Sequence, residues 1–127
     1  MPRISTIFFL LSSVCLAIGM MWGMHMAQSQ DHTMAPAHAH LNLMGGVLSA
    51  VFGTFYALTR ETYSPRLAWI NFFLSLIAVV VTIPALAMLL ATNDPKYEMF
   101  TAAGSMAMLL SLLVFMLSVL RELFRRR

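Results

Sequence analysis

Charged side chains are scarce in this chain, and those present are confined to short segments. Only 10% of its 127 residues are Asp, Glu, Lys or Arg, whereas 60% are hydrophobic. Soluble domains carry roughly a quarter charged residues, so the composition excludes an ordinary soluble protein. The long apolar runs contain no Asp, Glu or Lys, which argues against the intramembrane proton path of a pump.

Cysteine and histidine are also restricted. The single Cys15 has no disulfide partner in the chain, and we expect it to be a small buried residue of a helix. All four histidines lie between residues 25 and 40, and the rest of the chain has none. A site built on histidine must therefore come from this one part of the sequence.

Four apolar windows are each long enough to cross a bilayer, which takes about 20 residues. They cover residues 4–27, 36–58, 67–91 and 99–120, and turn-forming residues such as Asn93, Asp94 and Pro95 separate them. Links this short make successive helices adjacent and antiparallel. We expect an all-α integral membrane protein, a single transmembrane domain over residues 1–127. It would be an antiparallel four-helix bundle in contact with the lipid bilayer.

The basic residues predict the orientation of this bundle. If the N-terminus is inside, Lys96 is the only Lys or Arg in the outer loops. The other basic residues are then on the inner face, namely Arg3, Arg60, Arg66, Arg121, Arg125, Arg126 and Arg127. Cytoplasmic segments of membrane proteins are enriched in Lys and Arg, so we expect both termini to be cytoplasmic. The net charge of +3 then reflects orientation, and we expect no nucleic-acid partner.

The second window carries the residues that point to a site, because polar groups at membrane depth are costly and usually functional. At about 100° per residue, its inward stripe holds His38, Asn42, Gly45, Ser49, Gly53 and Tyr56. We expect the opposite face to meet lipid or a partner, and it holds His40, Met44, Val47, Val51, Phe55 and Leu58. The later windows repeat the inward pattern with Asn71, Ser75, Ala78, Thr82 and Ala85, and with Gly104, Ala107, Ser111 and Ser118.

A haem site is the first interpretation of this pattern, since imidazole is a common axial ligand of haem iron. Antiparallel packing would bring His25 to the depth of His38, which predicts a bis-imidazole site for haem b near the outer face. Gly45 and Ser49 would let a flat macrocycle approach the backbone. Asn42 would orient the ring or bond a propionate.

Copper handling at the periplasmic face is another interpretation, because thioether and imidazole ligands together suit Cu(I). His40 and Met44, spaced i and i+4, form a soft pair and are reserve ligands for either cofactor. The methionines around the histidines are Met20, Met21, Met24, Met26, Met34 and Met44. Methionine is also an ordinary filler of apolar helices. A cofactor-free accessory or assembly subunit of a respiratory complex is a separate interpretation, ranked directly after haem, and the small-residue faces and the absence of charge within the apolar windows support it.

The histidine segment also carries a family resemblance. The chain resembles small bacterial four-helix membrane proteins that are grouped with subunit I of the haem–copper oxidases. The likeness is carried mainly by the histidine segment, residues 37–45, and is supported by residues 22–23, 30–33 and 52–56. In that subunit the helices form three arcs of four, and a histidine on the second helix binds the low-spin haem. By resemblance, His38 or His40 takes that position, and the face analysis prefers His38.

The resemblance further implies a respiratory electron-transfer role in the bacterial inner membrane, with the histidines on the periplasmic side. It suggests a homo-oligomer, such as a trimer that imitates the three arcs, or association with respiratory complex subunits. An oxygen-reducing site needs further histidines on later helices, and this chain has none there. We therefore do not expect it to be an enzyme on its own.

Overall fold

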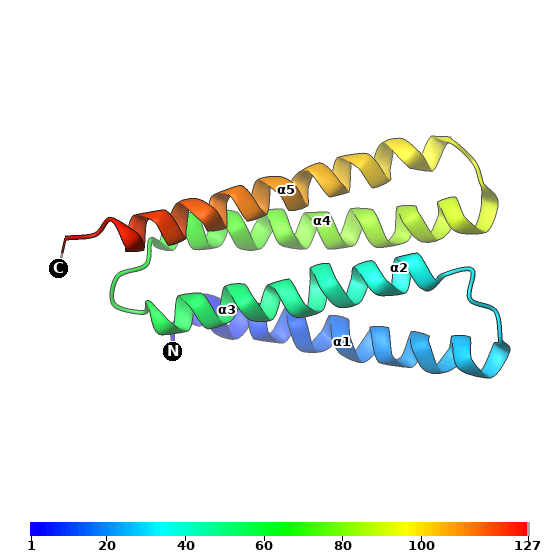
Figure 1. Cartoon of the computed structure of the whole chain (residues 1–127), viewed down its shortest axis with the longest axis horizontal. Coiled ribbons are helices and arrows are strands. Elements are labelled where there is room, and N and C mark those ends of the chain that lie inside the picture. Colours follow the sequence, from blue (N-terminus) through cyan, green and yellow to red (C-terminus); the bar gives the residue numbers. More distant parts are fainter. Residues whose placement is uncertain (127) are drawn as a thin grey trace.

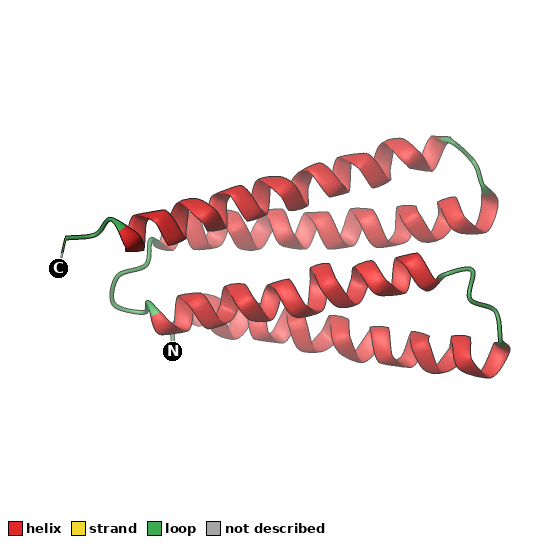
Figure 2. Cartoon of the chain, viewed as in Figure 1, coloured by secondary structure: helices red, strands yellow, loops and turns green. Residues whose placement is uncertain are grey.

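The chain folds into four long helical rods that pack side by side (Figures 1 and 2). The computed structural model describes residues 1–126, so Arg127, the last residue of the basic tail, lies outside the described part. The elements in order are α1 (Arg3–Ser29), α2 (Ala35–His40), the π-helix η1 (Leu41–Val47), α3 (Leu48–Leu58), α4 (Pro65–Thr92) and α5 (Lys96–Leu123). The segments α2, η1 and α3 form one continuous rod.

Two of the connections lie at one end of the bundle and are built alike. Gln30 after α1 and Asn93 after α4 both adopt the left-handed backbone conformation, with φ of 57° and 54°, and this conformation ends a helix. Asp31 and Asp94 follow, and each carboxylate accepts the backbone N–H two residues further on at 3.0 Å. We call this the loop end; the chain termini and residues 59–64 lie at the other, terminal end (Figure 1).

The predicted fold class is confirmed. The structure is all-α, and each helix end lies within three residues of the end expected from the apolar windows. Four rods are long and apolar enough to cross a membrane. The length of the apolar windows and the turn-forming residues between them were sufficient to predict the number of helices and their bounds.

Small residues mark the places where the helices come closest. A Cβ at Gly45 would lie 2.5 Å from Cys15 Sγ, and one at Gly104 would overlap the Thr82 hydroxyl and lie 2.9 Å from the Thr82 backbone nitrogen. Helices in lipid associate through such close approach of their backbones. The predicted inward residues of the second rod from Gly45 onward are buried, namely Gly45, Ser49, Gly53 and Tyr56.

Met44 is the exception to the predicted faces. We expected it on the outward face with His40, but only 8% of its surface is exposed. The cause is η1, in which the Leu48 N–H donates to the carbonyl of Leu43, five residues earlier. A π-helix turns less per residue than an α-helix, so the register changes within it. As a result, four residues of η1 are buried, namely Leu41, Met44, Gly45 and Gly46.

One buried polar network joins α3, α4 and α5. The fully buried Asn71 of α4 accepts a hydrogen bond from Ser111 Oγ at 2.6 Å through Oδ1 and donates from Nδ2 to the hydroxyl of Tyr56 at 3.1 Å. The hydroxyl oxygens of Ser75 and Ser111 are 2.6 Å apart. Interhelical bonds of this kind require all three helices to be in register.

Much of the apolar surface of the bundle faces outward. Helix α5 is covered mainly by α4, and its other side exposes large apolar residues such as Met99, Phe100, Met106 and Leu117. A monomer in water rarely exposes contiguous apolar surface on this scale. The exposed surface therefore matches contact with membrane lipid.

Replacing Gly104 with alanine should destabilise the α4–α5 pair. The added methyl would meet the Thr82 backbone, which cannot move aside unless the helices separate. We expect the free energy of unfolding to fall by about 1–3 kcal/mol, measured as the midpoint of unfolding in a sodium dodecyl sulfate titration followed by circular dichroism. Ala103→Leu on the exposed side of α5 is the control. An equal effect of both substitutions would contradict the close approach.

Replacing Asn71 with alanine should remove the centre of the polar network. Ser111 and Tyr56 would each lose a buried partner, and an unpaired buried polar group costs about 1–3 kcal/mol. The expected result is a lower temperature for loss of helical circular dichroism in a mild detergent. Ser105→Ala, whose exposed hydroxyl bonds only within its own helix, should behave as the unmodified chain. If Asn71→Ala melts at the unmodified temperature, the network contributes nothing to stability.

Candidate functional site

All four histidines lie towards the loop end, but the structure does not gather them into one cluster. His25 is on α1, His32 is in the following loop, and His38 and His40 are on α2. Within residues 1–126, no three His, Cys, Asp or Glu side chains are arranged to hold a metal ion. Each imidazole therefore has to be judged by its own neighbours.

His38 packs directly against α1. A Cβ on Gly23 would lie 3.2 Å from His38 Cε1, and a Cβ on Gly19 would overlap the amide oxygen of Asn42. Both histidine and amide are half-buried. Gly19 and Gly23 are four residues apart and so share one face of α1. This spacing of glycines, a known signal of close helix crossing, could have identified the contact from the sequence.

The two ring nitrogens of His38 have different surroundings. Asn42 Nδ2 lies 3.3 Å from His38 Nε2, and because an amide nitrogen can only donate, Nε2 is the acceptor and the ring proton resides on Nδ1. Within the described chain, His38 Nδ1 and Asn42 Oδ1 are buried and have no hydrogen-bond partner. Unpaired buried groups of this kind cost about 1–3 kcal/mol each, so packing on α1 holds this polar pair in place at a cost in stability.

The imidazole of His40, unlike that of His38, hydrogen-bonds to a backbone carbonyl of its own helix. Its Nδ1 lies 2.7 Å from the carbonyl oxygen of Pro36, one turn earlier. A carbonyl can only accept, so Nδ1 carries the proton and Nε2 keeps its lone pair. The side chain is exposed. Metal-ligating histidines almost always have their other ring nitrogen fixed by such a partner, so His40 has the local chemistry of a ligand.

His25 faces away from His38. Gly23 contacts the His38 ring, and His25, two residues further along, lies about 200° around the helix from it. The residues that share its face on α1 are all exposed, namely Val14, Ile18 and Met21. The expected similarity in depth did not take this rotation into account: on α1, His25 lies on a different face from Gly23, which contacts His38.

The space expected beside Gly45 for a flat macrocycle is filled by α1. Cys15 Sγ lies 2.5 Å from the position of a Cβ on Gly45, and Leu16 Cδ2 lies 2.5 Å from that of Gly46. Ser49 is fully buried in the same interface. These small residues allow the helices to approach each other, and they do not form an open cradle.

A cavity of about 370 Å³ opens at the loop end. It lies between the last turns of α1, the following loop and the end of α4, and its lining residues are Trp22, His25, Met26, Ser29, Asp31, Thr33, Met34 and Ala91. From the sequence, we expected His25 to be a haem ligand and noted Met26 and Met34 as methionines around the histidines. Asp31 was not predicted to belong to a site. The signal that was available is the polar turn from Asp31 to Thr33 immediately after a helix end.

The carboxylate of Asp31 is held in its charged form. The Thr33 hydroxyl donates to it at 2.6 Å and the Thr33 backbone N–H at 3.0 Å. These two bonds, with smaller contributions from His32 and His25, lower the pKa of Asp31 below its ordinary value. The cavity therefore has a negative charge at its mouth near neutral pH.

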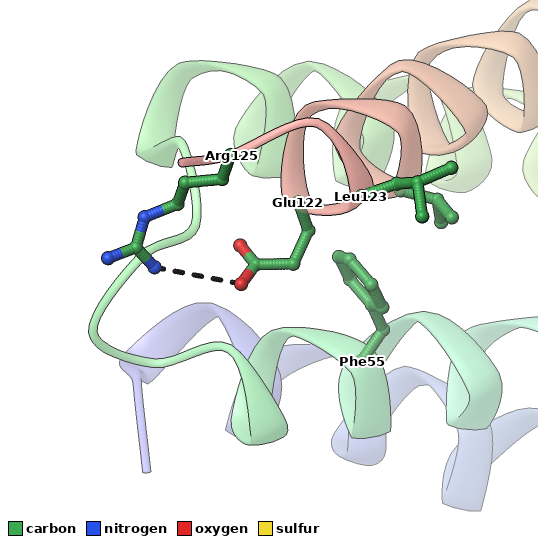
Figure 3. A pocket seen from close by; sticks show the side chains of 5 residues that line it. Phe55, Glu122, Leu123 and Arg125 are labelled. Atoms are coloured by element: carbon green, nitrogen blue, oxygen red, sulfur yellow. Dashed lines mark ion pairs between the residues drawn. The ribbon is translucent and has the colours of Figure 1, made fainter. Parts of the chain in front are cut away.

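A second cavity, of about 520 Å³, lies at the terminal end, where Phe55, Glu122, Leu123 and Arg125 line it (Figure 3). Glu122 accepts a hydrogen bond from the Thr62 hydroxyl at 2.7 Å and lies 3.6 Å from the Arg125 guanidinium. The bond from Thr62 ties the loop of residues 59–64 to α5, and Arg121 adds a second tie by donating to the Thr62 carbonyl oxygen at 2.8 Å. Anchoring of the loop therefore explains the role of Glu122.

Thr33→Val should raise the pKa of Asp31 towards its ordinary value, because the hydroxyl donor is lost while the backbone donor remains. The stabilisation from a carboxylate with a lowered pKa is present above its unfolded pKa and is lost as the pH falls through the folded value. As the pH falls, the variant should therefore lose the stabilisation from the charged Asp31 carboxylate at a higher pH than the unmodified chain. The carboxyl carbon-13 shift in an acid titration measures the pKa, and Thr54→Val, whose hydroxyl bonds only within α3, is the control. An unchanged Asp31 titration in Thr33→Val would contradict the assignment.

The comparisons with known proteins do not identify a family for this chain. No family model matches it, and neither does any curated protein or solved structure. Of the predicted resemblance, the structure bears out four long apolar helices that are able to cross a membrane.

Proposed function

We propose that this chain binds haem b in the inner membrane and takes part in one-electron transfer, with His40 as an axial ligand. The observation that carries the proposal is the bond from His40 Nδ1 to the Pro36 carbonyl oxygen, 2.7 Å long. It fixes the ring as the tautomer whose Nε2 can coordinate iron. His38, the ligand preferred from the sequence, has its Nε2 engaged by Asn42.

The position of His40 bears on how the second axial ligand is supplied. His40 lies on the exposed side of α2, and α1 fills the interface on the inner side at Gly45 and Gly46. We therefore propose that the haem is held on the outer side of α2 and that the second ligand comes from another copy of the chain. The resemblance to a subunit built of three four-helix arcs supports such a homo-oligomer.

The chain's own residues limit the chemistry. Bound haem with two imidazole ligands supplies reversible one-electron transfer. Helices α4 and α5 contain no histidine, so they offer no imidazole ligands for the additional copper of an oxygen-reducing centre. His38 and Asn42 act as positioning residues, because they fix the start of the second rod against Gly19 and Gly23 of α1.

The distribution of charge supports the placement in the membrane. The termini lie at the terminal end (Figure 1), and Arg60 of the second connection and Arg66 of the first turn of α4 belong to the same end. Cytoplasmic segments are enriched in such residues. We propose that the loop end, with the histidines, faces the periplasm.

His40→Ala should abolish the α band in the reduced-minus-oxidised spectrum of the protein purified in mild detergent from haem-supplied cells. His38→Ala should keep the band, because the His38 ring packs on Gly23 of α1 and its Nε2 is engaged by Asn42, and His32→Ala is the matched control in the loop. Loss of the band in His38→Ala with retention in His40→Ala would reverse the assignment. Haem-free unmodified protein would refute the haem function, and its co-purification with a larger complex would favour an accessory subunit.

A further inference from the structure

The cavity at the loop end collects a set of donor atoms that the haem proposal does not use. Its lining includes His25, Met26, Met34 and Asp31, whose side chains carry one imidazole, two thioethers and one carboxylate. They come from α1 and from the loop that follows it, and Ala91 of α4 also lines the cavity. Residues with soft and charged side chains from two segments therefore border one space of about 370 Å³.

We propose that this cavity is a binding site for a single Cu(I) ion, with His25, Met26 and Met34 as ligands. The site is independent of the haem proposal, because it uses neither His38 nor His40. Asp31 would provide charge compensation at the mouth. No redox step is part of the proposal, since the ion would arrive and leave as Cu(I).

The donor types select the ion. Thioether sulfur is a soft ligand that favours Cu(I), and imidazole completes a mixed nitrogen and sulfur set. Calcium and magnesium prefer oxygen ligands. Structural zinc is held by four Cys, His, Asp or Glu ligands, and the part of the chain covering residues 1–126 holds no cluster of even three.

The two ligand methionines differ from their neighbours in their surroundings. Met20, Met21 and Met24 are exposed by 68%, 58% and 59%, as residues facing lipid would be, whereas Met26 is only 7% exposed. Met34 is half-buried directly before α2. Only Met26 and Met34 among these methionines line the cavity beside an imidazole.

The electrostatics of the cavity also favour a cation. No Lys or Arg lines it, and Asp31 is its only acidic residue. The half-buried indole of Trp22 forms part of the wall, and an aromatic face attracts a nearby cation. A singly charged ion is therefore balanced by one carboxylate.

The experiment uses the full chain in mild detergent, titrated anaerobically with Cu(I) in competition with the chromogenic chelator bicinchoninate. We expect one Cu(I) per chain. Met34→Leu should weaken binding at least about tenfold, a loss of about 1.4 kcal/mol, and His25→Gln should do the same. Leucine is close to methionine in volume, so the fold should survive, and circular dichroism checks this.

Met24→Leu is the matched control, since it removes an exposed thioether from the same helix outside the cavity. It should leave the affinity unchanged. Copper-edge X-ray absorption of the loaded protein should show sulfur neighbours in the unmodified chain and fewer of them in Met34→Leu.

Three results would overturn the site: no Cu(I) bound by the unmodified chain, equal weakening by Met24→Leu and Met34→Leu, or a copper environment of nitrogen and oxygen alone. The haem content of the same preparations separates the two proposals. Met34→Leu should retain whatever haem the unmodified chain carries, so that either proposal can fail without the other.

Discussion

Close approach of helix backbones at small residues is the constraint on which the rest of this structure depends. A helix surrounded by apolar groups gains little by burying apolar side chains against another helix, so contact has to come from packing and from hydrogen bonds. The glycines decide where that contact occurs. Gly45 packs against Cys15, and Gly104 packs against Thr82. Asn71, Tyr56 and Ser111 then hold α3, α4 and α5 in one register through hydrogen bonds.

The same constraint divides the polar groups of the bundle into two kinds. In the middle, Asn71 finds partners on two other helices, and its role is fully explained by stability. Near the loop end, His38 and Asn42 satisfy each other only in part and leave His38 Nδ1 and Asn42 Oδ1 buried without partners within the described chain. Native structures tolerate few such groups. The hydroxyls of Ser5, Ser49 and Thr82 are also buried without a partner within residues 1–126, whereas Asn71 is paired through both its amide oxygen and its amide nitrogen.

The π-helix η1 links the packing to the candidate site. By changing the helical register, it turns Met44 inward and presents Gly45 and Gly46 together to α1. Segments of this kind are frequent at functional sites. On the loop side of η1, His40 keeps its exposed position and its bond to Pro36. His25 belongs to a different part of the surface and to a different set of donors.

The sequence by itself determined the number of helices, their bounds to within three residues and most of their inward faces. It could do so because hydrophobic length, turn residues and helical periodicity are local properties. It also located the histidines at one end. The tertiary structure alone decided the burial of Met44, the packing of His38 against Gly23 of α1 and the filling of the space at Gly45. Each of these depends on helix rotation or on a register change in η1, and a regular period of 3.6 residues cannot reveal either.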